Sequence, residues 1–368
     1  MSNKKILFVG SFKTTAKDGG VGGQMFACKT IINSSISDSV DWTLIDTTSD
    51  SNIPAGFIKR LWKAIQRVLI FFYRIIFFRY DAVLIFVADG WSFWEKGLMA
   101  LMAKSLSKAK VIIAPRSGYI IDNIVDKGKL SKFITYVFNK VDVVICQSLS
   151  WKNIFSECAP LNNTSKFVII ENMIDYKKYA VLPMSQKDTG EEITILFMAW
   201  VKRNKGIYEF IDAVKLLNNE NLNFKVIIAG KGEDSDAIIK EIEEGGLINR
   251  IDVKGWVLGD EKLKMLAESD IFALPTYFEG YPNSLMEAMA SGKACIATKV
   301  GSIPDMIDHM ETGMLIDKKN SQQLYEALKY LIKEKDARKA ISINAREVVR
   351  ERNSIESGVE KFKNILIK

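Results

Sequence analysis

Short runs of apolar residues recur along the chain and alternate with stretches whose apolar residues follow a helical period. The runs expected to form strands are Ile6–Val9, Val83–Val87, Val111–Ala114, Val143–Cys146, Phe167–Ile170, Ile193–Met198, Lys225–Ala229, Ile271–Leu274 and Ala294–Ala297. A strand that is apolar on both faces needs helices on both sides of its sheet, which is typical of parallel sheets. The sequence therefore predicts an α/β fold built from parallel sheets.

The chain of 368 residues is long enough for two domains of this kind. The segment 176–192 is polar, contains a proline and shows no sustained period, so it is the expected boundary. We predict a doubly wound, Rossmann-like domain over 1–180 and a second over 190–350, followed by a terminal helix over 351–368. Ligands of such sheets bind at the carboxyl ends of the strands, so two domains facing each other would bind a ligand in a central cleft.

The composition argues against several other classes of protein. Hydrophobic residues make up 48% of the chain and charged residues 26%, as in globular proteins. The four cysteines lie singly, without metal-ligand spacing, which favours buried thiols in a reducing cytoplasm. The chain has one histidine, His309, so neither a histidine-based metal site nor a catalytic triad is expected. The first apolar run is too short for the core of a signal peptide.

The segment 270–313 carries the clearest chemical pattern. A strand pattern ending at Pro275 is followed by a turn rich in glycine and proline, and then by a short helix pattern. The N–H groups at the start of such a helix make an anion site, and Glu279 and Glu287 lie on either side of it. Two carboxylates beside an anion site suit a nucleotide sugar, which has phosphate between two polyols. A simpler explanation is that Ser284 and Glu287 form a capping box, while Glu279 is a solvated loop carboxylate.

The whole segment closely resembles the E-x7-E signature of the retaining glycosyltransferases of family four. The matching residues are Glu279-Gly280, Pro282-Asn283, Glu287-Ala288-Met289-Ala290, Gly292, Thr298 and Gly301-Ser302-Ile303-Pro304-Asp305. The resemblance implies the two-Rossmann GT-B fold, with the terminal helix packed against the first domain. It also implies that Glu279 holds hydroxyl groups of the donor sugar and that Glu287 holds the ribose. The donor would further meet backbone N–H groups around Gly280, Tyr281, Asn283 and Ser284.

The resemblance also implies a mechanism. In this family the acceptor hydroxyl attacks from the face of the leaving group, and a phosphate oxygen takes its proton. No side chain has to act as a nucleophile. The nucleotide-diphosphate sugar is the co-substrate, and no metal or other cofactor is implied. The segment around Gly255–Val257 resembles the part of the family's fold that lines the nucleotide base.

A basic turn follows one of the strand patterns and contains Lys202, Arg203 and Lys205. Lysine at a strand end can act as a point charge on phosphate, although a solvated cluster at a helix start is the alternative. The family usually has G-R-x-x-x-x-K-G here, and Lys205-Gly206 matches its second half. Ala199-Trp200 replace the glycine and arginine, so Lys202 or Arg203 would supply the missing cation. Lys205 is the first candidate for stabilising the diphosphate as it leaves.

Two candidate sites lie in the predicted first domain. The run DGGVGGQ resembles the family's N-terminal glycine loop, in which Gly20 or Gly22 would approach the donor diphosphate. A plain flexible turn is the alternative. Arg116 or Ser117 stands where the family commonly has a histidine near the reacting sugar. Arg116 would stabilise developing negative charge there, or would form a structural salt bridge.

The segment Phe57–Arg79 is basic and aromatic. At about 100° per residue its polar residues fall within an arc of roughly 120°, and almost all the others are apolar; the polar residues are Lys59, Arg60, Lys63, Gln66, Arg67 and Arg74. This pattern is typical of a helix that lies in a membrane interface and attracts anionic lipid. Charges interrupt each apolar run before it reaches the roughly 18 residues of a membrane span. The alternative is a core helix whose charged side faces water.

The sequence therefore predicts a retaining glycosyltransferase of the hexosyltransferase type, which moves a sugar from a nucleotide-diphosphate sugar to a hydroxyl acceptor. A membrane-seeking helix favours a lipid-linked saccharide as the acceptor, as in bacterial O-antigen or capsule assembly. The protein would then be cytoplasmic and peripheral on the inner face of the cytoplasmic membrane. No nucleic-acid partner is expected. The alternatives are a glycosyltransferase with a soluble acceptor and a nucleotide-sugar-binding protein without catalytic activity.

Overall fold

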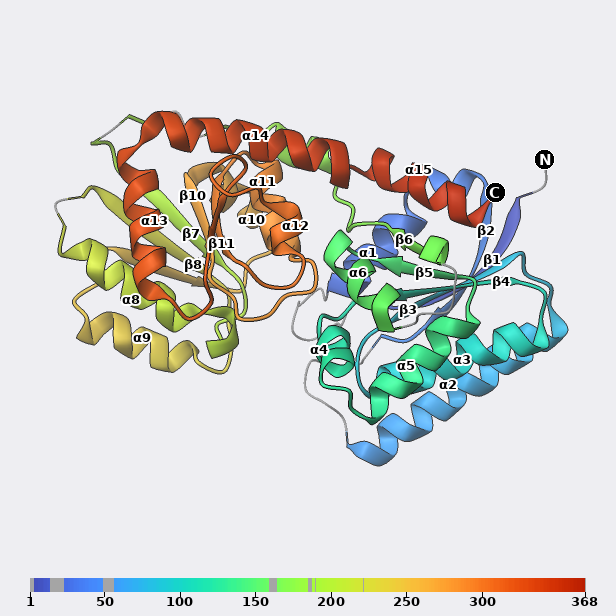
Figure 1. Ribbon diagram of the computed structural model, residues 1–368. Coiled ribbons are helices and arrows are strands. Elements are labelled where there is room, and N and C mark those ends of the chain that lie inside the picture. Colours follow the sequence, from blue (N-terminus) through green and yellow to red (C-terminus); the bar gives the residue numbers. More distant parts are fainter. Residues whose placement is uncertain are drawn as a thin grey trace. The chain divides into compact units, whose positions relative to one another are not determined.

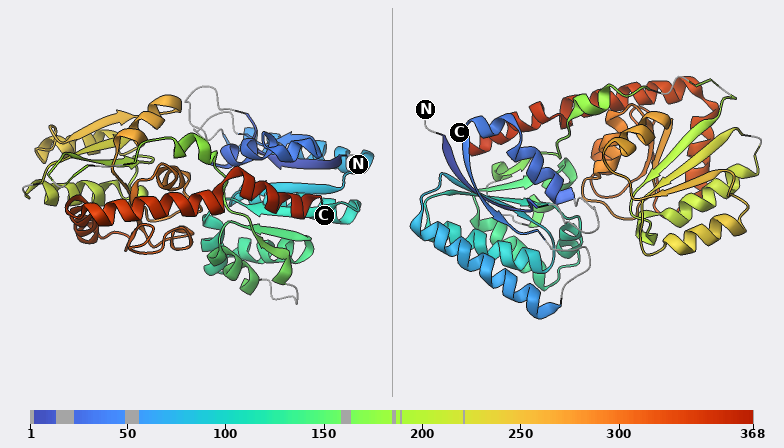
Figure 2. Two further views of the ribbon diagram at one scale, coloured as in Figure 1. Left: turned by 90° about the horizontal axis from the view of Figure 1, so that it is seen from above. Right: turned by 180° about the vertical axis from the view of Figure 1, so that it is seen from behind.

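The computed structural model of the protein describes residues 3–13, 23–48, 56–158, 164–184, 187–188, 190–220 and 222–367 (Figure 1). The chain forms two compact units: unit 1 comprises Met1–Met173 and Ile355–Lys368, and unit 2 comprises Ile174–Ser354. Within the described residues each unit contains a six-stranded parallel sheet with helices on both faces, as Figures 1 and 2 show. The α/β class and the two Rossmann-like sheets expected from the sequence are confirmed.

The sheet of unit 1 has the strand order β2-β1-β3-β4-β5-β6. Its strands are β1 (Lys4–Gly10), β2 (Val40–Asp46), β3 (Ala82–Val87), β4 (Lys110–Pro115), β5 (Val143–Cys146) and β6 (Phe167–Ile169). Side chains alternate along a strand, so Leu7 and Val9 belong to one apolar layer and Ile6 and Phe8 to the other. Both layers are buried, which is why the central strands are continuous apolar runs in the sequence.

Helices cover both faces of this sheet. One face packs against α2 (Phe57–Phe77), α3 (Trp91–Leu106), α4 (Tyr119–Val125), α5 (Lys129–Lys140) and α6 (Leu149–Cys158). The other face packs against α1 (Gly23–Ile32), the short helix η1 (Ser35–Asp38) and α15 (Ile355–Leu366). A second short helix, η2 (Thr164–Lys166), precedes β6.

The last helix of the chain, α15, is part of unit 1. Val359 and Phe362 are buried in the same apolar cluster as Ile6 and Phe8. Lys361 of α15 also pairs with Glu171 at 2.5 Å. The helix expected over 351–368 therefore begins at Ile355, and its apolar face completes one side of the first sheet.

The sheet of unit 2 has the order β12-β11-β10-β7-β8-β9. Its strands are β7 (Ile193–Met198), β8 (Phe224–Ala229), β9 (Ile251–Gly255), β10 (Ile271–Leu274), β11 (Ala294–Thr298) and β12 (Met314–Ile316). One face packs against α8 (Ile207–Asn218), α9 (Ser235–Glu244) and α13 (Ser321–Lys333). The other packs against α7 (Tyr176–Ala180), α10 (Gly259–Glu268), α11 (Asn283–Ala290) and α12 (Ile303–Met306). The long helix α14 (Lys335–Asn353) contributes to both layers.

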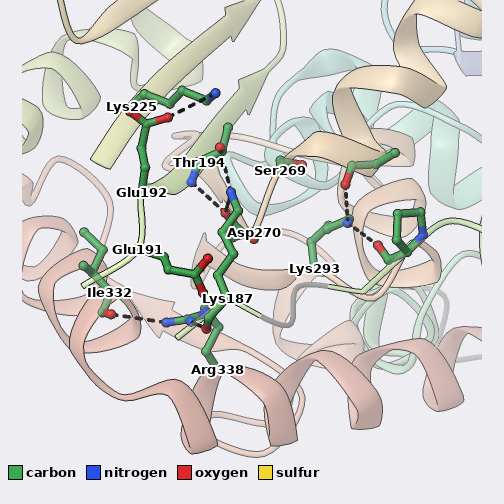
Figure 3. Close-up of polar contacts among 12 residues, drawn as sticks. Lys187, Glu191, Glu192, Thr194, Lys225, Ser269, Asp270, Lys293, Ile332 and Arg338 are labelled. Atoms are coloured by element: carbon green, nitrogen blue, oxygen red, sulfur yellow. Dashed lines mark hydrogen bonds and ion pairs between the residues drawn. The ribbon is translucent and has the colours of Figure 1, made fainter. Parts of the chain in front are cut away.

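The boundary between the units lies at Ile174, ahead of the expected segment 176–192. The reason is that α7, which the sequence-based boundary assigned to the first domain, buries Tyr179 in the core of unit 2. Polar contacts then attach the following residues to the same unit (Figure 3). The Asp270 carboxylate, just before β10, accepts hydrogen bonds from the Thr194 backbone N–H and from Lys187 Nζ, both at 2.7 Å.

Two buried cations complete this cluster (Figure 3). Arg338 donates to the carbonyl oxygens of Leu331 and Lys187, each at 2.6 Å. Lys293 Nζ donates to the carbonyl oxygen of Pro183 at 2.8 Å, and burial lowers the pKa of Lys293 to about 8. The cluster joins the amino ends of β7 and β10 to the segment after α7, and its role is structural.

The strand orders place a topological switch point in each sheet. In unit 1 the chain runs from β1 to the neighbour β2 on one side and then to the neighbour β3 on the other. In unit 2 it runs from β7 through β8 to β9, and then returns to β10 on the other side of β7. In open parallel sheets, ligands bind outside the carboxyl ends of the strands at such points. The β1/β3 and β7/β10 edges are therefore the first places to look for a functional site.

Candidate active site

At the β7/β10 edge of unit 2, Lys205 meets Glu279. Lys205 ends a short helix, η3 (Arg203–Lys205), that follows β7, and Glu279 lies in the turn after β10. Lys205 Nζ donates to Glu279 Oε1, and both side chains are largely buried. The structure thus brings together two residues that are 74 positions apart and that the sequence assigned to one site.

Glycines allow the two turns to approach closely. Gly206 has φ of 73°, and a Cβ there would lie 1.9 Å from the carbonyl oxygen of Pro275. Gly301 has φ of 57°, and a Cβ there would lie 1.9 Å from the carbonyl oxygen of Glu279. Only glycine fits either position. The backbone around Lys205 is also bonded to the other turn, since Tyr277 N donates to Asn204 O at 2.9 Å.

Glu287 lies on α11 and is 6% exposed. Its Oε1 accepts hydrogen bonds from Tyr179 Oη at 3.0 Å and from Lys262 Nζ at 2.6 Å. Burial, followed by the charge of Glu287, raises the pKa of Tyr179, so its hydroxyl stays a neutral donor. The helix is capped at Pro282 and begins at Asn283, so Glu287 is inside the helix and makes no cap. The capping-box alternative is therefore wrong.

Lys262 and Tyr179 are functional candidates that the sequence reasoning missed. Lys262 lies on α10, 25 positions before Glu287 in the chain, and Tyr179 lies on α7, 108 positions before it. The sequence contained one indirect indication of Lys262, which follows the segment around Gly255–Val257 that resembles the family's base-lining segment. Tyr179 falls in a segment whose composition indicated a boundary.

The start of α11 presents backbone N–H groups, as the sequence predicted. No side chain caps this helix within the described residues, and its first turn leaves N–H groups without partners inside the helix. Gly280 is held from behind by Ser302, whose Oγ donates to its carbonyl oxygen. Tyr281 is buried, and its hydroxyl accepts a hydrogen bond from Asn353 Nδ2 at 2.7 Å. These contacts fix the backbone that leads into α11, which includes Gly280, Tyr281, Asn283 and Ser284.

Lys202 and Arg203 lie apart from the Lys205–Glu279 pair. Lys202 Nζ is 3.6 Å from Glu233 Oε1, and the Arg203 guanidinium stacks 4.1 Å from the centre of the Tyr208 ring. The structure does not bring either cation to Glu279. Next to them, Trp200 packs against Trp256 with ring centroids 4.8 Å apart. Trp256 follows the end of β9, so both indoles lie at the carboxyl edge of the sheet.

In unit 1, Arg116 follows the end of β4. Its Nη1 donates to Asn172 Oδ1 at 2.8 Å, and its guanidinium carbon lies 4.0 Å from the centre of the Phe86 ring. Burial lowers the pKa of Arg116 to about 10. No carboxylate within the described part of the chain pairs with it. Ser117 Oγ donates to Asp89 Oδ1 at 2.7 Å, while Gly20 and Gly22 lie outside the described residues.

The described residues contain no group of three or more His, Cys, Asp and Glu side chains placed to hold a metal ion. Among them, no helix combines the length and the apolar character needed to cross a bilayer.

The chain is similar to several curated glycosyltransferases. It is 26% identical over 274 residues to N-acetyl-alpha-D-glucosaminyl L-malate synthase of Bacillus anthracis, covering 73% of this chain and 71% of that protein. It is 23% identical over 275 residues to the capsular polysaccharide biosynthesis glycosyltransferase CapM of Staphylococcus aureus, covering 69% and 70%. A shorter match, 27% over 151 residues, covers 41% of this chain and 38% of a Campylobacter jejuni protein. That protein is the N,N'-diacetylbacillosaminyl-diphospho-undecaprenol alpha-1,3-N-acetylgalactosaminyltransferase.

Solved structures share the fold over nearly the whole chain. Sucrose-phosphate synthase of Thermosynechococcus elongatus superposes with a TM-score of 0.79 at 15% identity, covering 99% of this chain and 98% of that one. HepE of Anabaena, in complex with UDP and glucose, gives a TM-score of 0.71 at 17% identity, covering 99% and 100%. The protein-family model for the glycosyl transferases group 1 matches residues 183–348, which include the Lys205, Glu279 and Glu287 region. The chain has the GT-B fold of glycosyltransferases, and its segment 183–348 matches the glycosyl transferases group 1.

Proposed function

We propose that the protein transfers a sugar, with retention of configuration, from a nucleotide-diphosphate sugar to a lipid-linked saccharide at an anionic membrane surface. The observation that carries the donor half is the Lys205–Glu279 pair at the β7/β10 switch point, beside the start of α11. A cation, a carboxylate and backbone N–H groups converge there. These are the groups that a sugar diphosphate requires.

The donor would be held in three places. Glu279 accepts hydrogen bonds from hydroxyl groups of the sugar, and the N–H groups of α11 meet the diphosphate. Glu287, held in place by Lys262 and Tyr179, accepts hydrogen bonds from the ribose. A bound diphosphate competes with Glu279 for Lys205, because both are anions. Lys205 then balances the charge that grows on the leaving diphosphate.

The Trp200–Trp256 pair supports a nucleotide as the leaving group. Both rings lie at the carboxyl edge of the same sheet as Lys205. Indole rings offer a stacking surface to a base. The Anabaena structure that shares this fold binds UDP, and a uridine donor is the first to try for this chain.

The acceptor half rests on α2, whose large apolar residues mostly face away from the sheet. Among the described side chains of this helix, Phe71 and Ile75 are buried in the unit 1 core, with Val68 packed beside them. The opposite side is exposed and almost wholly apolar. Its exposed large apolar residues include Ile58, Leu61, Trp62, Ile65, Leu69, Phe72, Tyr73, Ile76 and Phe77. A core helix would face water with its charges, so that alternative is wrong.

The exposed apolar surface continues onto α3, which lies alongside α2 (Figure 1). Trp91, Trp94 and Leu98 of α3 are exposed, Trp91 by 63%. A monomer in water seldom exposes an apolar patch of this extent, and such patches mark protein or membrane contacts. Tryptophan and basic residues around an apolar face favour a membrane interface.

The basic residues of α2 divide into two groups. Lys59 and Arg60 are exposed near the start of the helix and are free to approach lipid phosphates. Arg67 forms a bidentate pair with Glu95 of α3, with N–O distances of 2.6 and 2.8 Å. Arg67 therefore fixes α2 to α3, and the attraction to anionic lipid falls to the other cations.

The relatives support a lipid-linked acceptor in polysaccharide assembly. One is named as a capsular polysaccharide glycosyltransferase, and another as acting on a sugar diphospho-undecaprenol. A membrane-bound enzyme would meet such an acceptor where the acceptor resides. In this proposal Arg116 provides a fixed positive charge on the acceptor-binding unit.

The test is nucleotide release from a panel of UDP-, GDP- and ADP-sugars, with vesicles carrying a polyprenyl-diphosphate saccharide as acceptor. We expect one donor to turn over, and Lys205→Met and Glu279→Gln to lower the rate by roughly 10²-fold. The matched control is Lys329→Met, which removes a lysine paired with Glu220 at 2.6 Å elsewhere in unit 2. Equal rates for Lys205→Met and wild type would contradict the donor site.

Two other outcomes would favour the alternatives. A protein that binds the donor but transfers its sugar to none of the acceptors would be a nucleotide-sugar-binding protein. Equally fast transfer to a soluble saccharide, without vesicles, would contradict the lipid-linked acceptor.

A further inference from the structure

At the β1/β3 switch point of unit 1 lie a buried cation, Lys96, and a partly buried cation, Arg116, from different elements. Lys96 lies on α3, which follows β3, and Arg116 directly follows β4, the next strand in the sheet. This is the edge where an open parallel sheet binds its ligand. Neither residue has a role in the donor site of unit 2.

Lys96 is 4% exposed, although its helix faces solvent on the other side. It forms no ion pair within the described part of the chain. The adjacent carboxylate, Glu95, is held by Arg67 at 2.6 Å. A lysine that is buried without a partner is costly, so its retention calls for a function.

Arg116 is in a similar position. Its Nη1 has Asn172 Oδ1 as a neutral partner at 2.8 Å, and one face of the guanidinium lies over the Phe86 ring. Its Nε is buried and has no hydrogen-bond partner. A guanidinium with an unused donor and no carboxylate has the geometry to accept an anion, since its N–H groups match phosphate oxygens.

The positive charges of Lys96 and Arg116 both influence the thiol of Cys28. Cys28 lies on α1, which covers the opposite face of the sheet from α3. Burial raises the pKa of the Cys28 thiol to about 11, and the positive charges of Arg116 and Lys96 act in the other direction. Both cations are therefore within electrostatic range of this thiol. The protonated thiol adds no negative charge there.

Two carboxylates lie at this edge. Asp89, after β3, accepts a hydrogen bond from Ser117 Oγ at 2.7 Å, and Asp46, at the end of β2, acts on Lys96 and Cys28. Asp46 accepts hydrogen bonds from the Phe12 backbone N–H at 2.9 Å and from Thr48 Oγ1 at 2.5 Å, and Lys13 Nζ lies 3.7 Å away. Asp46 is therefore already occupied by its own partners. Neither carboxylate forms an ion pair with Lys96 or Arg116 in the described residues.

We propose that Lys96 and Arg116 form an anion site that binds the diphosphate of a polyprenyl-linked acceptor. The identity of the ligand rests on the proposed function, while the anion site rests on the two cations alone. The position of α3 connects the site to the membrane. At about 100° per residue, Lys96 is on the opposite side of α3 from Trp91, Trp94 and Leu98. A prenyl chain in the interface and its diphosphate beside Lys96 would then be separated by about one helix diameter, roughly 10 Å.

Calorimetric titration of the full chain with geranyl diphosphate, and separately with inorganic pyrophosphate, tests the site. We expect Lys96→Met and Arg116→Met each to weaken the binding of geranyl diphosphate by about tenfold or more. Lys205→Met, in the donor site, should leave that affinity unchanged. So should Lys104→Met, which removes an exposed lysine from the same helix. If Arg116→Met does not fold, Arg116→Lys keeps the charge and tests the loss of the two parallel N–H donors of the guanidinium. Lys96→Met then tests the loss of a positive charge.

Three results would overturn the proposal. Unchanged affinity in Lys96→Met would exclude this lysine from an anion site. A loss of binding in Lys205→Met alone would place the diphosphate in the donor site. Tighter binding of inorganic pyrophosphate than of geranyl diphosphate would rule out a prenyl-linked source. Nucleotide-sugar turnover is measured independently, so a protein that binds geranyl diphosphate through Lys96 but releases no nucleotide contradicts only the proposed function.

Discussion

Glu279 and Glu287 differ in what surrounds them. Glu279 lies in a turn and pairs with the cation Lys205. Glu287 lies inside a helix and accepts hydrogen bonds from Lys262 and Tyr179. A carboxylate held by one cation can exchange it for a ligand at little cost. A buried carboxylate held by two donors is a fixed acceptor. The first therefore suits the reacting sugar, and the second suits a part of the donor that stays in place.

The convergence on Glu287 could not be predicted from the sequence. The spacing of Glu279 and Glu287, and the basic turn, indicated the donor site because neighbouring loops of a parallel sheet meet at one edge. Tyr179 and Lys262 come from helices whose packing depends on the complete fold. The burial of Lys96 could not be predicted for the same reason, because in the sequence it looks like any lysine on an amphipathic helix.

Removing the charge of Lys96 should stabilise the protein at neutral pH. Burial lowers the pKa of Lys96 from 10.5 to about 8 in the folded protein. The folded state therefore binds fewer protons than the unfolded state between these values, and wild-type stability rises with pH across that range. We expect Lys96→Met to raise the free energy of unfolding at pH 7 by up to about 3 kcal/mol.

This advantage should shrink as the pH rises from 8 towards 10.5, above which the lysine is largely neutral in both states. Urea unfolding at pH 7 and at pH 9.5 measures both effects, with Lys104→Met as the control. A Lys96→Met protein that is no more stable than wild type at pH 7 would show that the buried charge is already compensated.

Among the elements, the edge strands were the hardest to predict. Strands β2, β9 and β12 did not figure among the expected strands, and each lies at the end of a sheet. An edge strand is covered less completely than a central one, so it can carry polar residues. In β9 three consecutive residues are exposed, and β12 has three residues in all. The central strands are apolar on both faces and were found from that pattern.

The helix α2 shows a second limit of sequence patterns. Its periodicity indicated a polar arc and a broad apolar arc, but did not show which would face the sheet. The sheet takes a narrow strip around Phe71 and Ile75. This leaves the widest apolar arc towards the outside. The orientation depends on the Arg67–Glu95 pair and on the shape of the neighbouring α3, which only the folded unit supplies.

Vesicle flotation should depend on the outward face of α2. We expect the double variant Trp62→Glu, Leu69→Glu to lose most binding to vesicles, because it places charge within the apolar face. Charge reversal at Lys59 and Arg60 should reduce binding to anionic vesicles and have little effect on neutral ones. Each basic residue is worth about 1 kcal/mol near an anionic surface.

Ile239→Glu is the matched control, because Ile239 is an exposed apolar residue on α9 in unit 2. All four positions on α2 are exposed, so these variants should fold normally. Undiminished flotation of the Trp62→Glu, Leu69→Glu protein would contradict the membrane role of α2.

At the scale of the whole molecule, the two units repeat one plan. Each is a parallel sheet with a switch point, and each carries charged side chains at the carboxyl edge beside that point. The charges differ: unit 2 has an internally paired cation and carboxylate, and unit 1 has two cations without carboxylate partners in the described residues. The chain connects the units twice, near Ile174 and near Ile355.

The correct nucleotide should stabilise the whole chain through unit 2. A ligand that binds only the folded state, at a concentration 100 times its dissociation constant, raises the free energy of unfolding by about 2.7 kcal/mol. We expect UDP, or else GDP or ADP, to raise the unfolding temperature in this way. Lys205→Met should lose most of the shift, and Lys96→Met should retain it. A shift of equal size in wild type and Lys205→Met would contradict the assignment of Lys205 to the diphosphate.

In the proposed function, binding of the outward apolar face of α2 to a membrane would also affect how fast the enzyme finds its substrate. An enzyme held on a surface searches two dimensions, and its anchored acceptor is confined to the same thin layer. Both are then present at an effective concentration far above their average in the cell. The active site can therefore work with weak intrinsic affinity for the acceptor, which lets the lengthened product leave quickly. Apparent Michaelis constants should accordingly follow the surface density of acceptor in the vesicle and change little when more vesicles of the same composition are added.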